Sequence, residues 1–330
     1  MMLGLIEHFL NRLAMTALNL PIARYRFQLR ALTLIHFPAY AGSMWRGAFG
    51  SALKRAVCVT QQAKCEGCLL KQNCVYNTVF ETPAGQEPLL RKNTEAPHPY
   101  IIHPLATSGA SYAAGELFTV QLTVLGKALI HLPYFIHCFQ QMGEHGLGAH
   151  QGRFEVLALL QEQDLGAEDW QLIYPLATQA LQALTVRTAC VAEPPARLRL
   201  AFTTPFRARQ QGRLMTQDDF DLVTFLMGLV RRLSLLSAYH AQALRDVDFV
   251  ALRAQAQQVE LVAAELQGFA WKRRSNRQQR WIAMDGLVGS LELSGAGLAS
   301  LWPWLWWGQW VHAGKATVMG QGHYVLEAVA

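Results

Sequence analysis

The sequence has few charged residues: Asp, Glu, Lys and Arg make up 16% of it, whereas apolar residues make up 52%. This composition excludes a disordered chain, which lacks the apolar residues needed to build a core. No apolar run has the length expected of a bilayer span. The N-terminal stretch has Glu7 and His8 within its apolar part and no small-residue cleavage site. We therefore expect a globular cytoplasmic protein that is neither exported nor inserted into a membrane.

The length of the chain indicates the number of domains, and its net charge bears on the kind of partner. The 330 residues exceed one small domain and suit two domains of ordinary size. The 29 Lys and Arg residues outnumber the 23 Asp and Glu residues, which gives a net charge of +6. This balance is compatible with a polyanion as partner but does not require one.

Cysteine is also scarce, with six residues in the chain. In a cytosolic protein we expect thiols or metal ligands rather than disulfides. Four cysteines occur close together, and four thiolates in a small loop can bind zinc or an iron–sulfur cluster. We predict one structural zinc rather than an iron–sulfur cluster, because the spacing of the cysteines matches no standard ferredoxin motif. The predicted zinc ligands are Cys58, Cys65, Cys68 and Cys74. Cys138 and Cys190 stand alone in apolar surroundings, which predicts core positions.

A strand, a loop and a basic helix follow the N-terminal stretch. Residues 24–34 alternate polar and apolar side chains, which predicts a half-buried strand. Ser43 can cap a helix that ends near Val57. This helix is either an ordinary amphipathic helix or one that presents cations to a polyanion. Its cations are Arg46, Lys54 and Arg55.

The chain reads as two copies of one α+β unit. In each half a helix precedes a glycine-containing turn that leads into an apolar strand, at residues 146–157 and 314–326. A tandem repeat explains both the length and the doubled pattern. Glu193-Pro194-Pro195 suits a linker, so we place the domains at residues 1–192 and 193–330. The cysteines lie in an irregular insertion at about residues 58–104 of the first domain.

Basic residues gather in the second half. A strand near residue 200 leads into a loop with Arg207, Arg209 and Arg213, and a long helix follows from about Asp218 to His240. Residues 271–280 then contain five cations, which form either a solvated face or a site for an anionic partner. Trp271 and Trp281 at the ends of this run could stack on a base. The run includes Lys272, Arg273, Arg274, Arg277 and Arg280.

The glycine-containing turn near the C-terminus belongs to a longer glycine-rich stretch, which reads WVHAGKATVMGQGHY. Glycines allow a backbone to approach a phosphate and point N–H groups at it. The stretch is neither a phosphate-binding P-loop nor a dinucleotide fingerprint, so a tight structural turn is an equal alternative. Its relevant residues are Gly314, Lys315, Gly320, Gly322 and His323.

Several motifs together resemble one family. They are YAGSMWRGAFG, CEGC with a following cysteine, FETP, APHPY, the basic run before GLVG, and HAGKATVMGQGHY. In this combination and order the chain resembles CRISPR repeat-processing endoribonucleases, the RAMP-superfamily enzymes called the sixth Cas type, in the branch with a cysteine-rich insertion. The resemblance covers the chain from about Arg24. It implies an α+β fold of tandem ferredoxin-like (RRM-like) domains. Ala316 and His323 depart from the pattern, which has glycine and arginine there.

The resemblance also implies a chemistry that needs no metal. The 2′-OH of the RNA attacks the adjacent phosphorus and leaves a 2′,3′-cyclic phosphate and a 5′-OH. Histidine is the natural base, and a cation can stabilise the phosphorane. We rank His36 first, because the superfamily often has its catalytic histidine there, and keep His98, His312 and His323 as alternatives. Lys315 is the predicted cation.

Repeat RNA and the guide RNA made from it are the predicted partners, with other Cas proteins of an effector complex; we expect no small-molecule substrate. The predicted RNA-binding residues are Arg46, Lys54, Arg55, Arg207, Arg213, Arg273, Arg274, Arg277, Lys315, Gly320, Gly322 and His323. Two other functions remain open. The chain could be a non-cleaving RAMP subunit that binds guide RNA, or an unrelated nucleic-acid-binding regulator that uses the cysteine insertion to read its target.

Overall fold

The structure is a computed structural model that describes residues 20–62, 64–83, 96–105, 109–187, 191–241, 247–275 and 280–329. The N-terminal stretch, Cys190 and Arg277 lie outside these residues. The chain forms two compact units. The N-terminal unit comprises Leu20–Ala189 with Tyr239–Ala241, and the C-terminal unit comprises Cys190–Ala238 with Gln242–Ala330.

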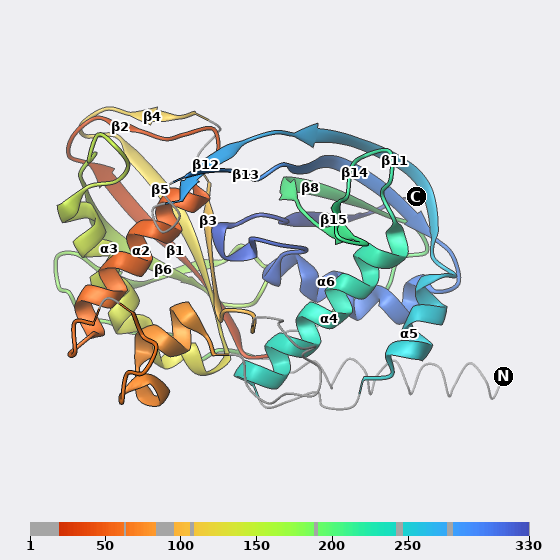
Figure 1. Cartoon of the computed structure of the whole chain (residues 1–330), viewed down its shortest axis with the longest axis horizontal. Coiled ribbons are helices and arrows are strands. Elements are labelled where there is room, and N and C mark those ends of the chain that lie inside the picture. The colour runs from red at the N-terminus through yellow and green to blue at the C-terminus, as the bar shows by residue number, and fades with distance from the viewer. Residues whose placement is uncertain are drawn as a thin grey trace. The chain divides into compact units, whose positions relative to one another are not determined.

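The N-terminal unit is built on a five-stranded antiparallel sheet in the order β3-β5-β1-β6-β7 (Figure 1). Its first four strands and two helices follow one another as βαββαβ, which is the ferredoxin-like arrangement. The strands are β1 (Ile22–Ala31), β3 (Tyr100–Pro104), β5 (Leu117–Leu125), β6 (Phe154–Glu162) and β7 (Trp170–Pro175). The helices are α2 (Gly42–Val57) and α3 (Leu132–His145). Short elements are β2 (Ile35–His36), β4 (Ser111–Tyr112), η1 (Lys71–Asn73), η2 (Asn77–Glu81) and η3 (Gly126–His131).

Aromatic side chains join the two helices to this sheet. Phe27 of β1 stacks on Phe139 of α3 with ring centroids 3.9 Å apart. Trp45 and Phe49 of α2 contact the same Phe139. All four side chains are buried, so the apolar residues of β1 face the helices and its arginines alternate to the other face. The predicted strand and helix are confirmed, but Ala41 rather than Ser43 precedes the helix as its cap residue.

The C-terminal unit repeats the arrangement on a four-stranded antiparallel sheet in the order β11-β14-β8-β15. Its strands are β8 (Leu198–Phe206), β11 (Glu260–Phe269), β14 (Gly286–Ser294) and β15 (Tyr324–Ala328), and its helices are α4 (Leu222–His240), α5 (Phe249–Ala256) and α6 (Leu298–Val311). Short elements are η4 (Thr317–Met319) and two hairpins, β9 (Arg209–Gln210) with β10 (Arg213–Leu214), and β12 (Lys272–Ser275) with β13 (Arg280–Ala283). The predicted tandem ferredoxin-like fold is therefore confirmed.

Helix α4 forms much of the core of this unit. Leu226, Leu229, Val230 and Leu233 are buried. The Asp221 carboxylate accepts a hydrogen bond from the Thr224 N–H, so an acid caps the helix. The expectation that no stretch is long and apolar enough to span a bilayer is wrong for this helix, which has that length and composition. More than half of the apolar window is buried inside the protein, as in the core helix of a globular domain.

Candidate functional site

The glycine-rich loop between α6 and β15 is attached to the end of strand β8. The Lys315 N–H donates to the Arg207 carbonyl at 2.7 Å, and the Gly322 N–H donates to the Pro205 carbonyl at 3.0 Å. The Thr204 hydroxyl donates to the Gly320 carbonyl at 2.7 Å. These bonds fix both sides of the loop to the same strand end.

The glycines of the loop are required by packing and backbone conformation. Gly314, Gly320 and Gly322 all have positive φ, which glycine adopts at little cost. A Cβ at Gly322 would lie 1.9 Å from the Ala313 carbonyl oxygen. The N–H groups of Gly320 and Gly322 donate to carbonyls of Thr317 and Pro205, and both residues are buried. These two amide protons are therefore used within the fold, and the RNA-binding role of the two glycines stays a prediction.

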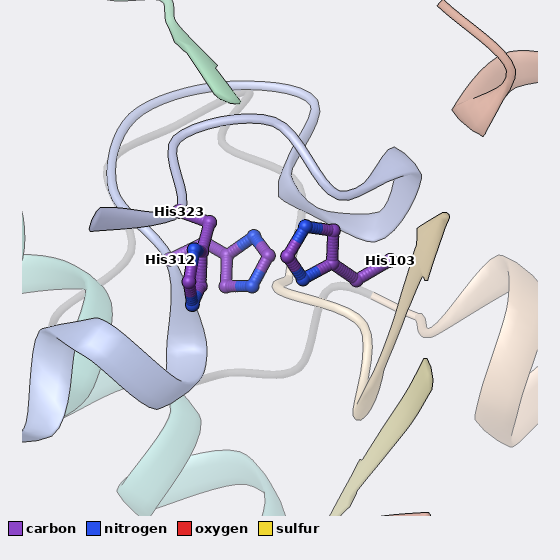
Figure 2. Close-up of side chains that lie close together, drawn as sticks. All are labelled: His103, His312 and His323. Carbon is purple, nitrogen blue, oxygen red and sulfur yellow. The ribbon is translucent and has the colours of Figure 1, made fainter. Parts of the chain in front are cut away.

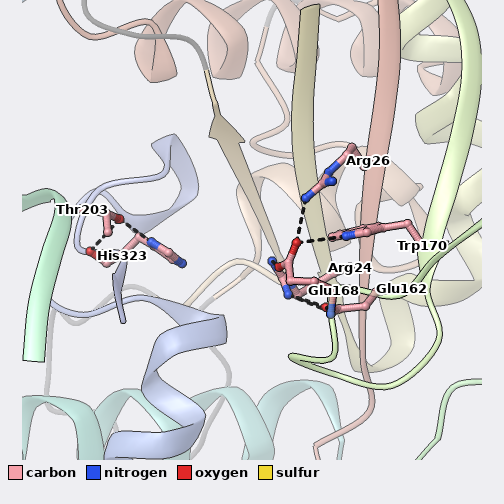
Figure 3. Close-up of polar contacts among 7 residues, drawn as sticks. All are labelled: Arg24, Arg26, Glu162, Glu168, Trp170, Thr203 and His323. Carbon is pink, nitrogen blue, oxygen red and sulfur yellow. Dashed lines mark hydrogen bonds and ion pairs between the residues drawn. The ribbon is translucent and has the colours of Figure 1, made fainter. Parts of the chain in front are cut away.

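Two histidines flank this loop: His312 directly follows α6, and His323 directly precedes β15. Figure 2 shows the rings of His312 and His323 close together, with centroids 5.0 Å apart. His312 is buried and its Nδ1 lies 3.1 Å from the Gln321 carbonyl oxygen, which gives it a structural role. His323 is half-buried, and its Nδ1 hydrogen-bonds the Thr203 hydroxyl (Figure 3). Of the two, only His323 has partial access to solvent.

Three predicted RNA-binding cations lie near the end of β8 or soon after it in the chain. Lys315 is exposed, and its backbone contact with Arg207 brings these two predicted residues together. Arg207 is half-buried and donates to the Asp285 carbonyl at 2.9 Å, and burial lowers the pKa of its guanidinium. Arg213 is exposed on the hairpin that begins two residues after Arg207. The structure thus groups three predicted RNA-binding residues in one part of the C-terminal unit.

Arg232 of α4 holds the start of the loop, a role that sequence reasoning missed. Its Nε donates to the carbonyls of Val311 and His312 at 2.9 and 3.0 Å. These are carbonyls at the end of α6, where a cation is favourable. Burial lowers the pKa of Arg232 to about 10. A charged residue within an apolar helix was the available signal, because a buried arginine needs acceptors nearby.

Residues 272–275 of the basic run form β12, which pairs with β13. Arg273 is half-buried and pairs with Ile282, while Arg274 pairs with Trp281 across the ladder. Trp271 is buried, so it does not offer a face to a base, whereas Trp281 is 67% exposed. Of the two tryptophans proposed for stacking, Trp281 alone has the required access.

His36 lies on the short strand β2 of the N-terminal unit. It is exposed, and its Nδ1 lies 2.7 Å from the hydroxyl oxygen of Ser111, the residue opposite it on β4. If Nδ1 donates this hydrogen bond, the lone pair of Nε2 faces outward as a base requires. His36 therefore has the solvent access expected of the first-ranked candidate.

His98 is placed differently, within a stack of aromatic rings. Its Nδ1 hydrogen-bonds the Thr82 hydroxyl at 2.8 Å, and its ring stacks with Phe80 and Tyr100 at 6.5 and 6.1 Å. The Arg46 guanidinium lies 4.4 Å from the centre of the Phe80 ring. These contacts give FETP and APHPY a structural role: they hold the cysteine segment onto α2.

The other predicted cations of α2 differ in access. Lys54 Nζ lies 5.8 Å from the centre of the Tyr76 ring, close to the same aromatic stack. Arg55 is exposed in the last turn of the helix. Of the three α2 cations, Arg55 has the fewest described structural contacts.

The arginines of β1 are neutralised by acids of the same unit (Figure 3). Arg24 is 7% exposed, and one of its nitrogens lies 2.8 Å from both carboxylate oxygens of Glu162. Arg26 bonds Glu168 at 3.0 Å and lies 4.0 Å from the centre of the Trp170 ring. Arg24 is therefore held in a buried ion pair on the face of β1 opposite the helices.

The four clustered cysteines line a single cavity of about 340 Å³ between α2 and η2. The Thr60 hydroxyl lies 3.7 Å from the sulfur of Cys58 and 3.8 Å from that of Cys68. A hydrogen bond from Thr60 lowers the pKa of Cys58, and burial raises that of Cys65. Cysteine thiolates are ligands that zinc prefers, and zinc binding by these four residues stays a prediction.

Two family models match successive parts of the chain. One, described as an N-terminal domain, matches residues 20–186. The other, described as CRISPR-associated endoribonuclease Cas6, matches residues 200–324 and so includes the glycine-rich loop. The Cas6 match therefore covers less than half of the chain.

A curated protein similar to this chain is an uncharacterized protein of Archaeoglobus fulgidus. The two are 27% identical over 124 residues, which is 38% of this chain and 41% of the relative. The match therefore spans less than half of the relative's length.

Solved Cas6 structures have the same fold as this chain. Thermus thermophilus Cas6 matches with a TM-score of 0.52 at 13% identity, over 93% of this chain and 99% of that one. A Cas6 product complex matches with a TM-score of 0.58 at 14% identity over the same shares. A partial Cas6-RT-Cas1–Cas2 complex matches with a TM-score of 0.53 at 11% identity, over 93% of this chain and 46% of that one.

Proposed function

We propose that this protein is an endoribonuclease that cleaves CRISPR precursor RNA within its repeats without a metal ion. The observation that carries the proposal is the match of the Cas6 family model to residues 200–324, on a chain with two ferredoxin-like units. Structures with the same fold include a Cas6 product complex and a Cas6-RT-Cas1–Cas2 complex. By analogy, we propose repeat RNA and other Cas proteins as partners of this chain.

The proposed reaction uses the nucleophile that RNA itself supplies. A base removes the proton of the 2′-OH, the 2′-oxygen bonds to phosphorus, and the bond from phosphorus to the 5′-oxygen breaks. His36 is the proposed base, because it is exposed and its Nδ1 is held by Ser111. Lys315 and Arg207 are the proposed cations for the phosphorane, since they lie together at the end of β8.

Phosphate contacts supply most of the proposed affinity for RNA. The exposed cations among the predicted residues suit this role best: Arg55, Arg213 and Lys315. His323, which is half-buried beside Thr203, is the proposed contact at the end of the loop. Arg46 and Lys54 lie over aromatic rings instead, so their contribution to RNA binding is expected to be smaller.

Cleavage in the presence of EDTA tests the proposal. Labelled repeat RNA is incubated with excess protein, so that one turnover is observed and weak binding is saturated. The proposal predicts a single cut by the wild type and a rate about 10² to 10⁴ lower for His36→Ala. His98→Ala is expected to lose stability before rate, because His98 belongs to the aromatic stack. Tight binding without any cut would instead favour a non-cleaving RNA-binding subunit.

We further propose that the four clustered cysteines hold one structural zinc. Their sulfurs line one cavity, and four thiolates would leave no position for a substrate. Metal analysis of purified protein should give about one zinc per chain. Replacing Cys65 and Cys68 by serine should lower the unfolding temperature while the cleavage rate of the folded fraction is kept. Anaerobically purified protein without zinc or iron would contradict the proposal.

A further inference from the structure

A second exposed histidine lies beside His36. His150 occupies the turn between α3 and β6, and its ring lies edge-on to that of His36 with centroids 5.9 Å apart. Both residues belong to the N-terminal unit, although they lie far apart in the sequence. Two exposed imidazoles at this distance can contact a single phosphodiester, one on each side of the phosphorus.

The turn that carries His150 is packed firmly against the segment that carries His36. The Leu32 N–H donates to the Arg153 carbonyl at 2.8 Å, and the Arg153 N–H donates to the Thr33 hydroxyl at 2.8 Å. A Cβ at Gly152 would lie 2.8 Å from Ile35 Cγ1 and 3.0 Å from the backbone of the same residue. Glycine at position 152 thus allows the turn to approach β2. The juxtaposition of the two histidines follows from the backbone of both segments.

We propose that His150 is the general acid of the RNA cleavage reaction and acts opposite His36 as general base. The inference rests on the endoribonuclease function proposed above. His36 Nε2 takes the proton of the 2′-OH as the bond between the 2′-oxygen and phosphorus forms. The bond from phosphorus to the 5′-oxygen breaks, and the departing oxygen takes a proton from the His150 imidazolium. One proton is accepted and one is donated, so the pair ends with its original number of protons.

The surroundings of the two rings favour this assignment over the reverse. His36 is held by the Ser111 hydroxyl at Nδ1, which suits a neutral ring with its lone pair on Nε2. His150 lies on an exposed turn, so its ring is open to the departing 5′-oxygen of a bound RNA. A leaving alkoxide is far more basic than either ring, so protonating it lowers the barrier.

A substrate with sulfur in place of the bridging 5′-oxygen tests the role of His150 directly. A thiolate leaves without a proton, because a thiol has a pKa of about 8.5. We expect His150→Ala to cut ordinary RNA about 10² to 10⁴ more slowly than the wild type in single turnover. The same variant should cut the sulfur-substituted RNA at nearly the wild-type rate. His36→Ala should be slow on both substrates, because a better leaving group does not replace a base.

Controls separate chemistry from folding. His145→Ala removes another exposed histidine, at the end of α3, and should leave both rates unchanged. His150→Asn keeps a polar side chain on the turn and should show the same selective loss, with an unchanged unfolding temperature. Wild-type cleavage of ordinary RNA by His150→Ala, or a loss that the sulfur substrate does not rescue, overturns the acid role alone. A wild type that never cuts repeat RNA overturns the endoribonuclease proposal and the acid role with it.

Discussion

Ala316 has a backbone conformation that glycine normally adopts. Its φ of 60° and ψ of 24° lie in the left-handed region, which costs a residue with a Cβ about 1–2 kcal/mol. The family resemblance leads one to expect glycine at this position, and the structure shows why. The loop keeps the conformation because its bonds to the end of β8 hold both sides.

We predict that Ala316→Gly stabilises the C-terminal unit. Relief of the strained φ outweighs the greater freedom that glycine gives to the unfolded chain, so the free energy of unfolding should rise by up to about 1 kcal/mol. Denaturant unfolding measures this change. Ala313→Gly is the matched control in the same loop: Ala313 is buried and does not have a positive φ, so this change should destabilise the protein. Equal loss of stability in both variants would contradict the strain at Ala316.

Single residues also show which features of the structure could be predicted from the sequence alone. The position of His36 was predicted through a family motif, and its exposure agrees with the predicted role. The neighbour His150 was missed, because no local pattern links residues so far apart. Cys138 is buried as predicted, and burial raises its pKa to about 12. The ion pair that buries Arg24 was missed, because its partner Glu162 lies 138 positions away.

At the scale of elements, α2 serves as the support for the cysteine segment. A Cβ at Gly50 would lie 2.2 Å from Cζ of Phe80, so the FETP motif packs against a bare part of the helix. A Cβ at Gly47, one turn earlier, would meet no atom of the described residues within 4 Å. The two glycines therefore differ in surroundings while sharing one helix.

We predict opposite effects of alanine at these two glycines. Gly50→Ala should destabilise the N-terminal unit by about 1–3 kcal/mol, because Phe80 must move away from the helix. Gly47→Ala should stabilise it by about 1 kcal/mol, because alanine favours a helix and has open space at this position. Thermal unfolding of both variants gives the comparison. A Gly50→Ala protein as stable as Gly47→Ala would mean that Phe80 does not pack on α2.

The β12–β13 hairpin carries the densest group of cations in the chain. Arg273 and Arg274 lie on β12, and we predict that each contacts a phosphate of the repeat RNA. Replacing both by glutamine should then reduce the slope of log affinity against log salt by about two units. Arg253→Gln, which removes an exposed arginine of α5, serves as the comparison. An unchanged slope in the double variant would assign the hairpin to a solvated surface.

The two halves of the molecule share one topology although their sequences look different. The repeated order of helix, glycine-containing turn and apolar strand was enough to predict two α+β units, and the family resemblance supplied the strand order. The sequence did not reveal strand β11, whose side chains are mostly exposed, or the fifth strand of the first sheet. Edge strands of this kind are defined by backbone pairing, which leaves a weak pattern in the side chains.

The chemical ends of the RNA fragments test the central claim most directly. Repeat RNA is cut by excess wild-type protein in EDTA, and the fragments are analysed by mass spectrometry. Attack by the 2′-OH predicts one cut, with a 2′,3′-cyclic phosphate on the upstream fragment and a 5′-OH on the downstream fragment. Fragments that end in a 3′-OH and a 5′-phosphate, or cleavage that stops when EDTA is added, would contradict a metal-independent endoribonuclease.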